Sequence, residues 1–191
     1  MRTTALAIVG YFYIDFREPT KQEARGLLSS LLTQFSTQSD RFRHILTSLH
    51  ASHVHGQEQP DEDDLAQCLR EMLEVRNQAP VFIVVDALDE CPNSEGLPTP
   101  RDRALKIVKE LVELKLPHLH LCITSRPEVD ITKVLDPLKL YSVSLHEEVG
   151  QIDDIARYVE SVVLDDATMR EWPKEVKNLV INTLAKEGGG M

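Results

Sequence analysis

The sequence has few cysteines and no long hydrophobic run. Its 191 residues include three cysteines, Cys68, Cys91 and Cys122, whose spacing shows no paired pattern. Such an odd and sparse set excludes a disulfide scaffold and indicates a reducing compartment. No stretch reaches the roughly 18 apolar residues of a membrane span, and the apolar segment near Met1 is too short and mixed for a signal peptide. We therefore expect a soluble, cytoplasmic protein that binds no membrane.

Positive charge is also scarce. The chain has 21 Lys and Arg residues against 31 Asp and Glu residues, which gives a formal net charge of −10, and no basic patch stands out. Because nucleic-acid binding depends on Lys and Arg contacts to phosphates, we expect no nucleic-acid partner. The hydrophobic share of 42% and the charged share of 27% are ordinary for a globular protein, and the length is sufficient for one domain with a core.

Glycine is infrequent, and its positions exclude one motif. Of the eight glycines, three stand at 188–190, and none of the eight is followed by Lys and then Ser or Thr. The loop Gly-x-x-x-x-Gly-Lys-Ser/Thr, whose backbone amides and lysine hold nucleotide phosphates, is therefore absent from this sequence.

A strand with carboxylates at its end is the strongest functional signal. Residues 81–85 are continuously apolar and lead into Asp86, Asp89 and Glu90. Such a run is typical of a parallel strand buried on both faces, and ligands bind at the carboxyl ends of these strands. The pattern predicts the Walker B strand of a P-loop NTPase. Asp86 would hold Mg²⁺ through water, while Asp89 and Glu90 would act on the attacking water. The alternative is a solvated acidic turn after a core strand.

Arg126 is the second candidate site residue. A further apolar strand is expected at residues 119–124, and Arg126 follows it closely. A guanidinium group at this strand end could sense the γ-phosphate of a nucleotide. The alternative is a surface arginine that pairs with Glu128 or Asp130.

The remaining patterns predict an α/β fold with a parallel, P-loop NTPase-type sheet in three layers, covered by helices on both faces. Thr20 and Glu23 are typical of a capping box at the start of the first helix. Strands are expected at 6–16, 81–85, 119–124 and 141–145, and helices at 20–35, 42–49, 65–77, 104–114, 152–163 and 176–184. We expect an incomplete nucleotide-binding core at 1–148 and the start of a helical subdomain at 149–191.

Three segments together resemble NACHT-type NTPases. Residues 81–91 resemble their Walker B motif, an apolar run followed by Asp, a small residue, an apolar residue, Asp and Glu. Residues 119–128 resemble their sensor-1 strand, with Arg126 in the sensing position. Residues 10–16 and the leucine-rich helix after them resemble the strand and helix between Walker A and Walker B. The whole chain is similar to fungal NACHT proteins with a nephrocystin-3-like N-terminal domain, which belong to the STAND class of regulatory ATPases.

The resemblance implies a cytosolic signalling ATPase that uses ATP together with Mg²⁺, while the residues of this chain do not distinguish ATP from GTP. Nucleotide state would control assembly in self/non-self or immune-type signalling. Protein partners would bind through effector and repeat domains outside this chain, and the full-length protein would form an oligomer. In the family the phosphate loop, Walker A, and a helix precede the strand expected here at 6–16, whereas five residues precede Leu6. We therefore expect a fragment cut at both ends, or a degenerate gene product, that binds nucleotide weakly or not at all.

Two other functions remain open. The first is a non-catalytic interaction or scaffold module that keeps the NTPase fold without its catalytic cycle. The second is a small-molecule kinase, a weaker hypothesis because the sequence shows no arginine-rich lid. Since the phosphate loop is absent, the sequence alone does not assign catalytic activity to this chain.

Overall fold

The computed structural model describes residues 6–53, 58–94, 96–144 and 151–187. The chain divides into two compact units, Met1–Lys139 and Leu140–Met191. The boundary expected between residues 148 and 149 lies outside the described residues. None of the described helices is long and apolar enough to cross a membrane.

The first unit is built on a parallel sheet of three strands. The strands β1 (Ile8–Tyr13), β2 (Val81–Asp86) and β3 (Leu119–Ile123) lie in that order. Ile8, Val81 and Leu119 are in register across the sheet. Apolar and β-branched side chains favour extended backbone in these segments. Three of the four expected strands and the parallel α/β class are thus confirmed.

The fourth expected strand, at 141–145, is wrong. Residues 141–144 form neither strand nor helix, and Tyr141 and Val143 are exposed, while Leu145 lies outside the described residues. An alternating pattern gives a strand only where another strand supplies hydrogen bonds. Among the described residues, this segment pairs with no strand.

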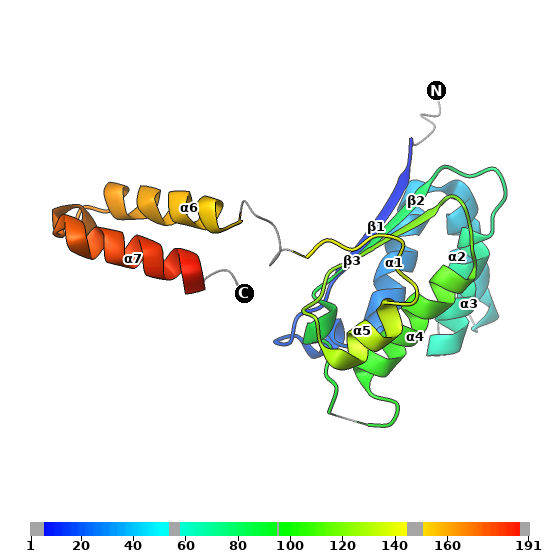
Figure 1. Cartoon of the computed structure of the whole chain (residues 1–191). Helices are drawn as coiled ribbons and strands as arrows, with labels where there is room; N and C mark the ends of the chain where they lie inside the picture. The colour runs from blue at the N-terminus through cyan, green and yellow to red at the C-terminus, as the bar shows by residue number, and fades with distance from the viewer. Residues whose placement is uncertain (1–5, 54–57, 95, 145–150, 188–191) are drawn as a thin grey trace. The chain divides into compact units, whose positions relative to one another are not determined.

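Apart from the three strands, the secondary structure of both units is helical (Figure 1). In the first unit they are α1 (Ala24–Gln38), α2 (Asp40–Ser52), α3 (Glu62–Leu73), α4 (Pro100–Glu113) and α5 (Val129–Leu135). The second unit contains α6 (Gln151–Asp165) and α7 (Lys174–Glu187), which pack on each other and are linked through a 3₁₀ turn at Met169–Glu171. The six expected helices are confirmed, whereas the sequence pattern did not indicate the short helix α5.

The capping box expected of Thr20 and Glu23 is wrong. Pro19–Lys21 form a separate 3₁₀ turn, and Glu23 precedes α1 without a side-chain hydrogen bond to the helix. Proline suits the first turn of a helix, so this turn holds Thr20 away from the N-cap position of α1. Capping boxes begin two other helices, α3 through Asp61 and Asp64 and α4 through Thr99 and Asp102.

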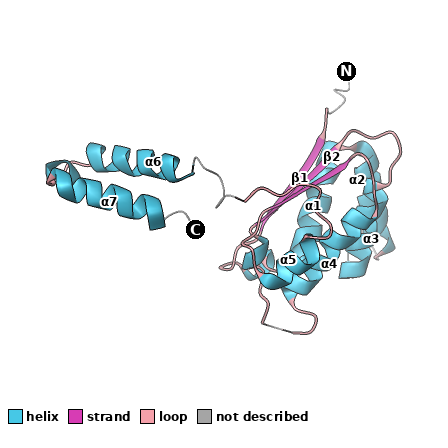
Figure 2. Cartoon of the chain, viewed as in Figure 1, coloured by secondary structure: helices cyan, strands magenta, loops and turns pink. Residues whose placement is uncertain are grey.

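The helices α1 to α5 lie on one face of the sheet (Figure 2). Because the chain advances in one direction from β1 to β2 to β3, right-handed crossovers place both connections on the same side. Exposed and buried side chains accordingly alternate along β1, and Val9, Tyr11 and Phe82 are 44%, 51% and 40% exposed. The expected burial of the sheet on both faces is therefore wrong for the described part of this unit, which has two layers.

The core lies between the sheet and the helices, and α1 packs closely on β1. Phe35 and Phe42 are fully buried, with ring centroids 6.0 Å apart. A Cβ atom at Gly10 of β1 would lie 2.6 Å from Cε1 of Phe35, closer than carbon atoms can approach without a shift. Glycine at this position thus allows α1 its close approach to the sheet.

A hydrogen-bonded pair joins the end of α2 to the start of α3. Nε2 of His53 lies 3.0 Å from Oδ2 of Asp64, and Nδ1 lies 3.0 Å from the carbonyl oxygen of Leu49. The bond with the Leu49 carbonyl, followed by the bond with Asp64, raises the pKa of His53 above its ordinary value of 6.5. The bond that Asp64 accepts from the Asp61 amide, followed by the bond with His53, lowers the pKa of Asp64.

We expect an NMR titration to show a His53 pKa above 6.5 that falls in Asp64→Asn. Because this pKa is raised, the contribution of His53 to stability is complete below its unfolded pKa and is lost as the pH rises through its folded pKa. The contribution of Asp64, whose pKa is lowered, is present above its unfolded pKa and is lost as the pH falls through its folded pKa. The control Asp63→Asn should leave His53 unchanged. An equal effect of both variants would contradict the pairing.

Candidate functional site

The candidate site lies where β2 and β3 end at the same edge of the sheet. Asp86 is the last residue of β2, and a 3₁₀ turn, Leu88–Glu90, follows it. Between them, Ala87 has a φ of 57°, in the left-handed region that residues other than glycine seldom adopt. Leu88 is fully buried and anchors the turn. The backbone therefore reverses abruptly after Asp86, which leaves Asp89 and Glu90 at the end of the strand.

Thr124 holds Asp86 in place. The Thr124 hydroxyl donates a hydrogen bond to Oδ1 of Asp86 and accepts one, at 2.9 Å, from the backbone amide of Ala87. The parallel register explains this contact, because Ile123 pairs with Val85 and the next residues of both strands therefore lie opposite each other. Sequence reasoning did not single out Thr124, although a hydroxyl at the last position of the strand expected at 119–124 was a usable signal.

Asp89 and Arg126 form the contact between the two strand ends. The backbone amide of Arg126 donates to Oδ1 of Asp89 at 3.0 Å, and Nε of Arg126 lies 3.5 Å from Oδ2. The Arg126 side chain is 79% exposed, so most of its guanidinium remains accessible to solvent. Its partner is thus Asp89, and not Glu128 or Asp130 as the alternative interpretation proposed.

Glu90 points to a third segment, the loop after β1. Its Oε2 accepts a hydrogen bond from the Phe16 amide at 3.1 Å. In the same loop, Arg17 binds Asp15 through its side chain and its backbone amide, and these bonds lower the pKa of Asp15 to about 2. Glu90 therefore connects the end of β2 to an ion pair beyond the end of β1.

The predicted site residues lie together at one sheet edge, but their side chains have separate partners. Asp86 binds Thr124, Asp89 binds Arg126, and Glu90 binds the Phe16 amide. Among the described residues, no three His, Cys, Asp or Glu side chains are close enough to hold one metal ion. A cation at this edge would thus find at most two such side chains among the described residues and take its other ligands from elsewhere.

Arg101 is a buried residue of α4 that organises the backbone beneath the site. It is 5% exposed, and it donates to the carbonyl oxygens of Cys91, at 2.9 Å, and Asp89, at 2.5 Å. Its other nitrogen, Nη1, binds the carboxylates of Glu128 and Asp130. One side chain thereby joins the loop after β2 to the start of α5. Sequence reasoning did not find this role, because Arg101 lies in the first turn of α4 and precedes the helix expected at 104–114.

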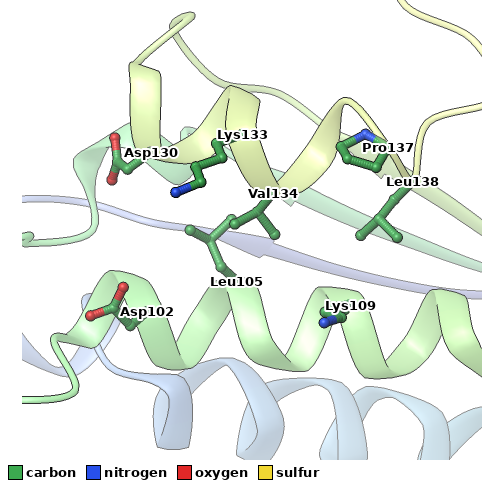
Figure 3. A pocket seen from close by; sticks show the side chains of 8 residues that line it. All are labelled: Asp102, Leu105, Lys109, Asp130, Lys133, Val134, Pro137 and Leu138. Carbon is green, nitrogen blue, oxygen red and sulfur yellow. The ribbon is translucent and has the colours of Figure 1, made fainter.

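A groove between α4 and α5 is distinct from this site (Figure 3). Its volume is ≈ 460 Å³. The residues lining it are Leu105, Val134, Pro137 and Leu138, with Asp102, Lys109, Asp130 and Lys133. None of the four predicted site residues contributes to it. The groove therefore adds no substrate pocket to the strand ends.

We expect Arg101→Ala to destabilise the first unit by about 3 kcal/mol, because it removes the buried donor to two carbonyl oxygens and to Glu128, while Asp130 keeps its hydrogen bond from Asn93. The control Arg103→Ala, on the same helix, removes a half-exposed ion pair with Glu62 at 3.4 Å, which should cost less than about 1 kcal/mol. Urea unfolding followed by circular dichroism measures both. Similar losses in the two variants would contradict the role assigned to Arg101.

Comparison with known proteins identifies the family. A family model described as Nephrocystin 3, N-terminal matches residues 2–126, which is more than half of the chain and includes all four predicted site residues. No curated protein and no solved structure matches the chain. The extent of the family match shows that the chain belongs to the nephrocystin 3 N-terminal family.

Proposed function

We propose that the chain is part of a NACHT-like nucleotide-binding domain, of the P-loop NTPase type, in a cytoplasmic signalling ATPase of the STAND class. Membership of the nephrocystin 3 N-terminal family supports this proposal. The observation that carries it is the placement of Asp86, Asp89, Glu90 and Arg126 at the carboxyl ends of two adjacent parallel strands. Open α/β sheets bind their ligands at this edge.

Asp86 is the residue that would serve Mg²⁺. Carboxylate oxygen is a preferred ligand of Mg²⁺, which keeps several of its waters and takes further ligands from nucleotide phosphates. The hydrogen bond from Thr124 to Oδ1 fixes the orientation of this carboxylate. A single, well-oriented carboxylate therefore fits a water-mediated contact and does not form a complete protein cage. When bound, Mg²⁺ would neutralise phosphate charge.

Three further residues would act on the attacking water and on the γ-phosphate. They are Asp89, Glu90 and Arg126. The Asp89 and Glu90 carboxylates lie one turn after Asp86, where they could orient a water molecule for attack on a phosphate. Arg126 is held by Asp89 through its backbone amide, while its exposed side chain could turn from Asp89 toward a γ-phosphate. If the Arg126 side chain exchanged Asp89 for the γ-phosphate, the position of the end of β3 would depend on the bound nucleotide. Assembly of the full-length protein would then respond to the nucleotide state.

A metal titration tests the site without nucleotide. We expect Mn²⁺, used as a paramagnetic substitute for Mg²⁺, to broaden the amide signals of residues 86–90 and 124–126 first. Asp86→Asn should abolish this broadening, because it removes the oriented carboxylate. The control Asp63→Asn changes an acidic cluster at the start of α3 and should leave it intact. Broadening confined to α3, or unchanged in Asp86→Asn, would contradict the proposal.

Nucleotide affinity is a separate prediction. Because the sequence contains no Gly-x-x-x-x-Gly-Lys-Ser/Thr loop, we expect calorimetric titration of this chain with ATP and Mg²⁺ to show binding no tighter than millimolar. GTP should behave in the same way. Micromolar binding of either nucleotide would contradict the expectation that the phosphates need groups that this chain does not carry.

A non-catalytic interaction module is the second candidate function. The observation that favours it is the sheet face that no described helix of the first unit covers, where Tyr11 and Tyr13 are more than half exposed and Phe82 stacks on His120 with ring centroids 4.7 Å apart. Parallel sheets are usually covered on both faces, so an apolar face of this kind is suited to a protein partner. Failure of the Mn²⁺ titration would favour this function.

A further inference from the structure

Two glutamine side chains of α1 close the β1 edge of the sheet. Gln38 accepts a hydrogen bond from the Val9 amide at 3.0 Å and donates one to the Val9 carbonyl at 2.7 Å. Gln34 makes the same two bonds with Tyr11, at 3.0 Å and 2.7 Å. Four residues of helix rise about 6 Å and two residues of strand about 6.6 Å, so glutamines one helical turn apart match alternate strand residues. The glutamine pair, Gln34 and Gln38, therefore binds β1 as a neighbouring strand would.

Further hydrogen bonds fix the orientation of both side-chain amides. Nε2 of Gln38 also donates to the Gln34 carbonyl at 3.0 Å, and Nε2 of Gln34 also donates to Oγ of Ser30 at 2.9 Å. In the opposite orientation each side-chain oxygen would face a backbone carbonyl oxygen, and neither atom could donate. Each Nε2 thus has two acceptors for its two hydrogens, and each Oε1 has a backbone donor.

The glutamine pair binds the side of β1 that faces away from β2. The amides of Ile8 and Ile14 donate to carbonyl oxygens on the β2 side, those of residues 80 and 86. Because the backbone groups of successive residues in a parallel strand face alternate sides, those of Val9 and Tyr11 face outward. These are the groups that would pair with a further strand, and they are the groups that the glutamines occupy.

The strand β1 has the composition of a segment that pairs readily with other chains. Its six residues, Ile8–Tyr13, include two β-branched and three aromatic side chains, with no charged residue and no proline. Short segments of this kind form intermolecular sheets when their edges are exposed. Proteins usually protect edge strands with charges, prolines or a covering element. Since β1 carries no charge and no proline, its protection depends on the cover that α1 supplies.

We propose that Gln34 and Gln38 protect the β1 edge against pairing with other β strands, so that their loss converts β1 into a site of self-association. An apolar side chain in their place could cover the edge, but it could not bond to the outward amides and carbonyls. These groups would then lack protein partners, and the β1 strand of a second copy could supply them in a ladder. The inference is independent of nucleotide and metal binding, and hence of the proposed function.

Sedimentation velocity together with thioflavin T fluorescence tests the proposal. We expect Gln34→Met/Gln38→Met, which removes the hydrogen bonds and keeps the side-chain length, to form larger, thioflavin-binding assemblies at concentrations where the unaltered chain does not. The matched control is Thr33→Met/Thr37→Met, which changes two exposed residues one turn apart on the same helix, whose hydroxyls bond to carbonyls of α1. The control should behave as the unaltered chain. A folded glutamine variant that sediments like the unaltered chain, or equal association of both variants, would overturn the proposal.

A charge on β1 locates the associating surface. Lysine on an edge strand opposes pairing, so adding Tyr11→Lys to Gln34→Met/Gln38→Met should restore the sedimentation of the unaltered chain. Association that persists in this triple variant would place the contact on another surface and overturn the proposal.

Hydrogen exchange in the same triple variant isolates the backbone bonds. Compared with Tyr11→Lys alone, the Val9 amide should exchange about tenfold faster, because Gln38 no longer accepts from it. The amides of Gly10 and Phe12, which face β2 by the alternation described above, should keep their rates. Acceleration of all three amides would indicate unfolding of the sheet and would contradict a role confined to the edge, as would an unchanged rate at Val9.

A measurement on the unaltered chain requires no variant to fold. The side-chain amide hydrogens of Gln34 and Gln38 should exchange several-fold more slowly than those of Gln67, an exposed glutamine of α3 whose Nε2 donates to Glu71 at 3.1 Å. Equal exchange rates for the three glutamines would show that the pair does not hold the edge, and would overturn the proposal.

Discussion

The direction in which the chain crosses the sheet determines most of the first unit. Each step from β1 to β2 to β3 adds a parallel strand on the same side of the last one. Because crossovers between parallel strands are right-handed, the connecting helices gather on one face. The same parallel order brings the carboxyl ends of β2 and β3 to one edge, which places Asp86 beside Thr124. The covered face, the open face and the candidate site thus have one topological origin.

Arg101 positions the segments that follow β2 and β3. A parallel sheet fixes where its strands end but leaves the following backbone without partners. The buried guanidinium supplies donors to two carbonyl oxygens after β2 and to two carboxylates after β3. Glu128 and Asp130 are therefore held by Arg101, which leaves Arg126 to pair with Asp89. The exposed contact between Asp89 and Arg126 depends on the buried contacts beneath it.

The sequence predicted the helices and strands well, but it did not predict which face of the sheet the helices cover. The apolar run of β2 identified a parallel strand, but Phe82 within it is 40% exposed because no helix of this unit covers that face. Periodicity shows which side chains are apolar, and only topology decides which are covered. Tyr141 lies in an equally convincing pattern, which forms no strand because it has no strand partner among the described residues. The candidate carboxylates could be found because they follow the apolar run of β2 directly in the sequence.

The contacts that hold the site together could not be predicted in the same way. Arg101 lies in the first turn of α4, and its partners lie between 10 and 29 residues away in sequence. It forms these contacts through the tertiary packing of its helix on the sheet. Thr124 is intermediate, since the sequence showed that it lies at the end of an expected strand, but its bond to Asp86 required the strand register. Long-range polar contacts of this kind depend on the fold.

Electrostatics at the strand ends explain why a phosphate loop would matter under the proposed function. Asp86, Asp89 and Glu90 bring three carboxylates to one edge, while the charge of Arg101 is already matched by Glu128 and Asp130. Arg126 contacts one of these carboxylates, that of Asp89, and its charge is therefore already paired. A nucleoside triphosphate would add further negative charge to this edge. Its binding therefore requires Mg²⁺ together with the lysine and backbone amides of a phosphate loop, whereas the binding of a cation does not.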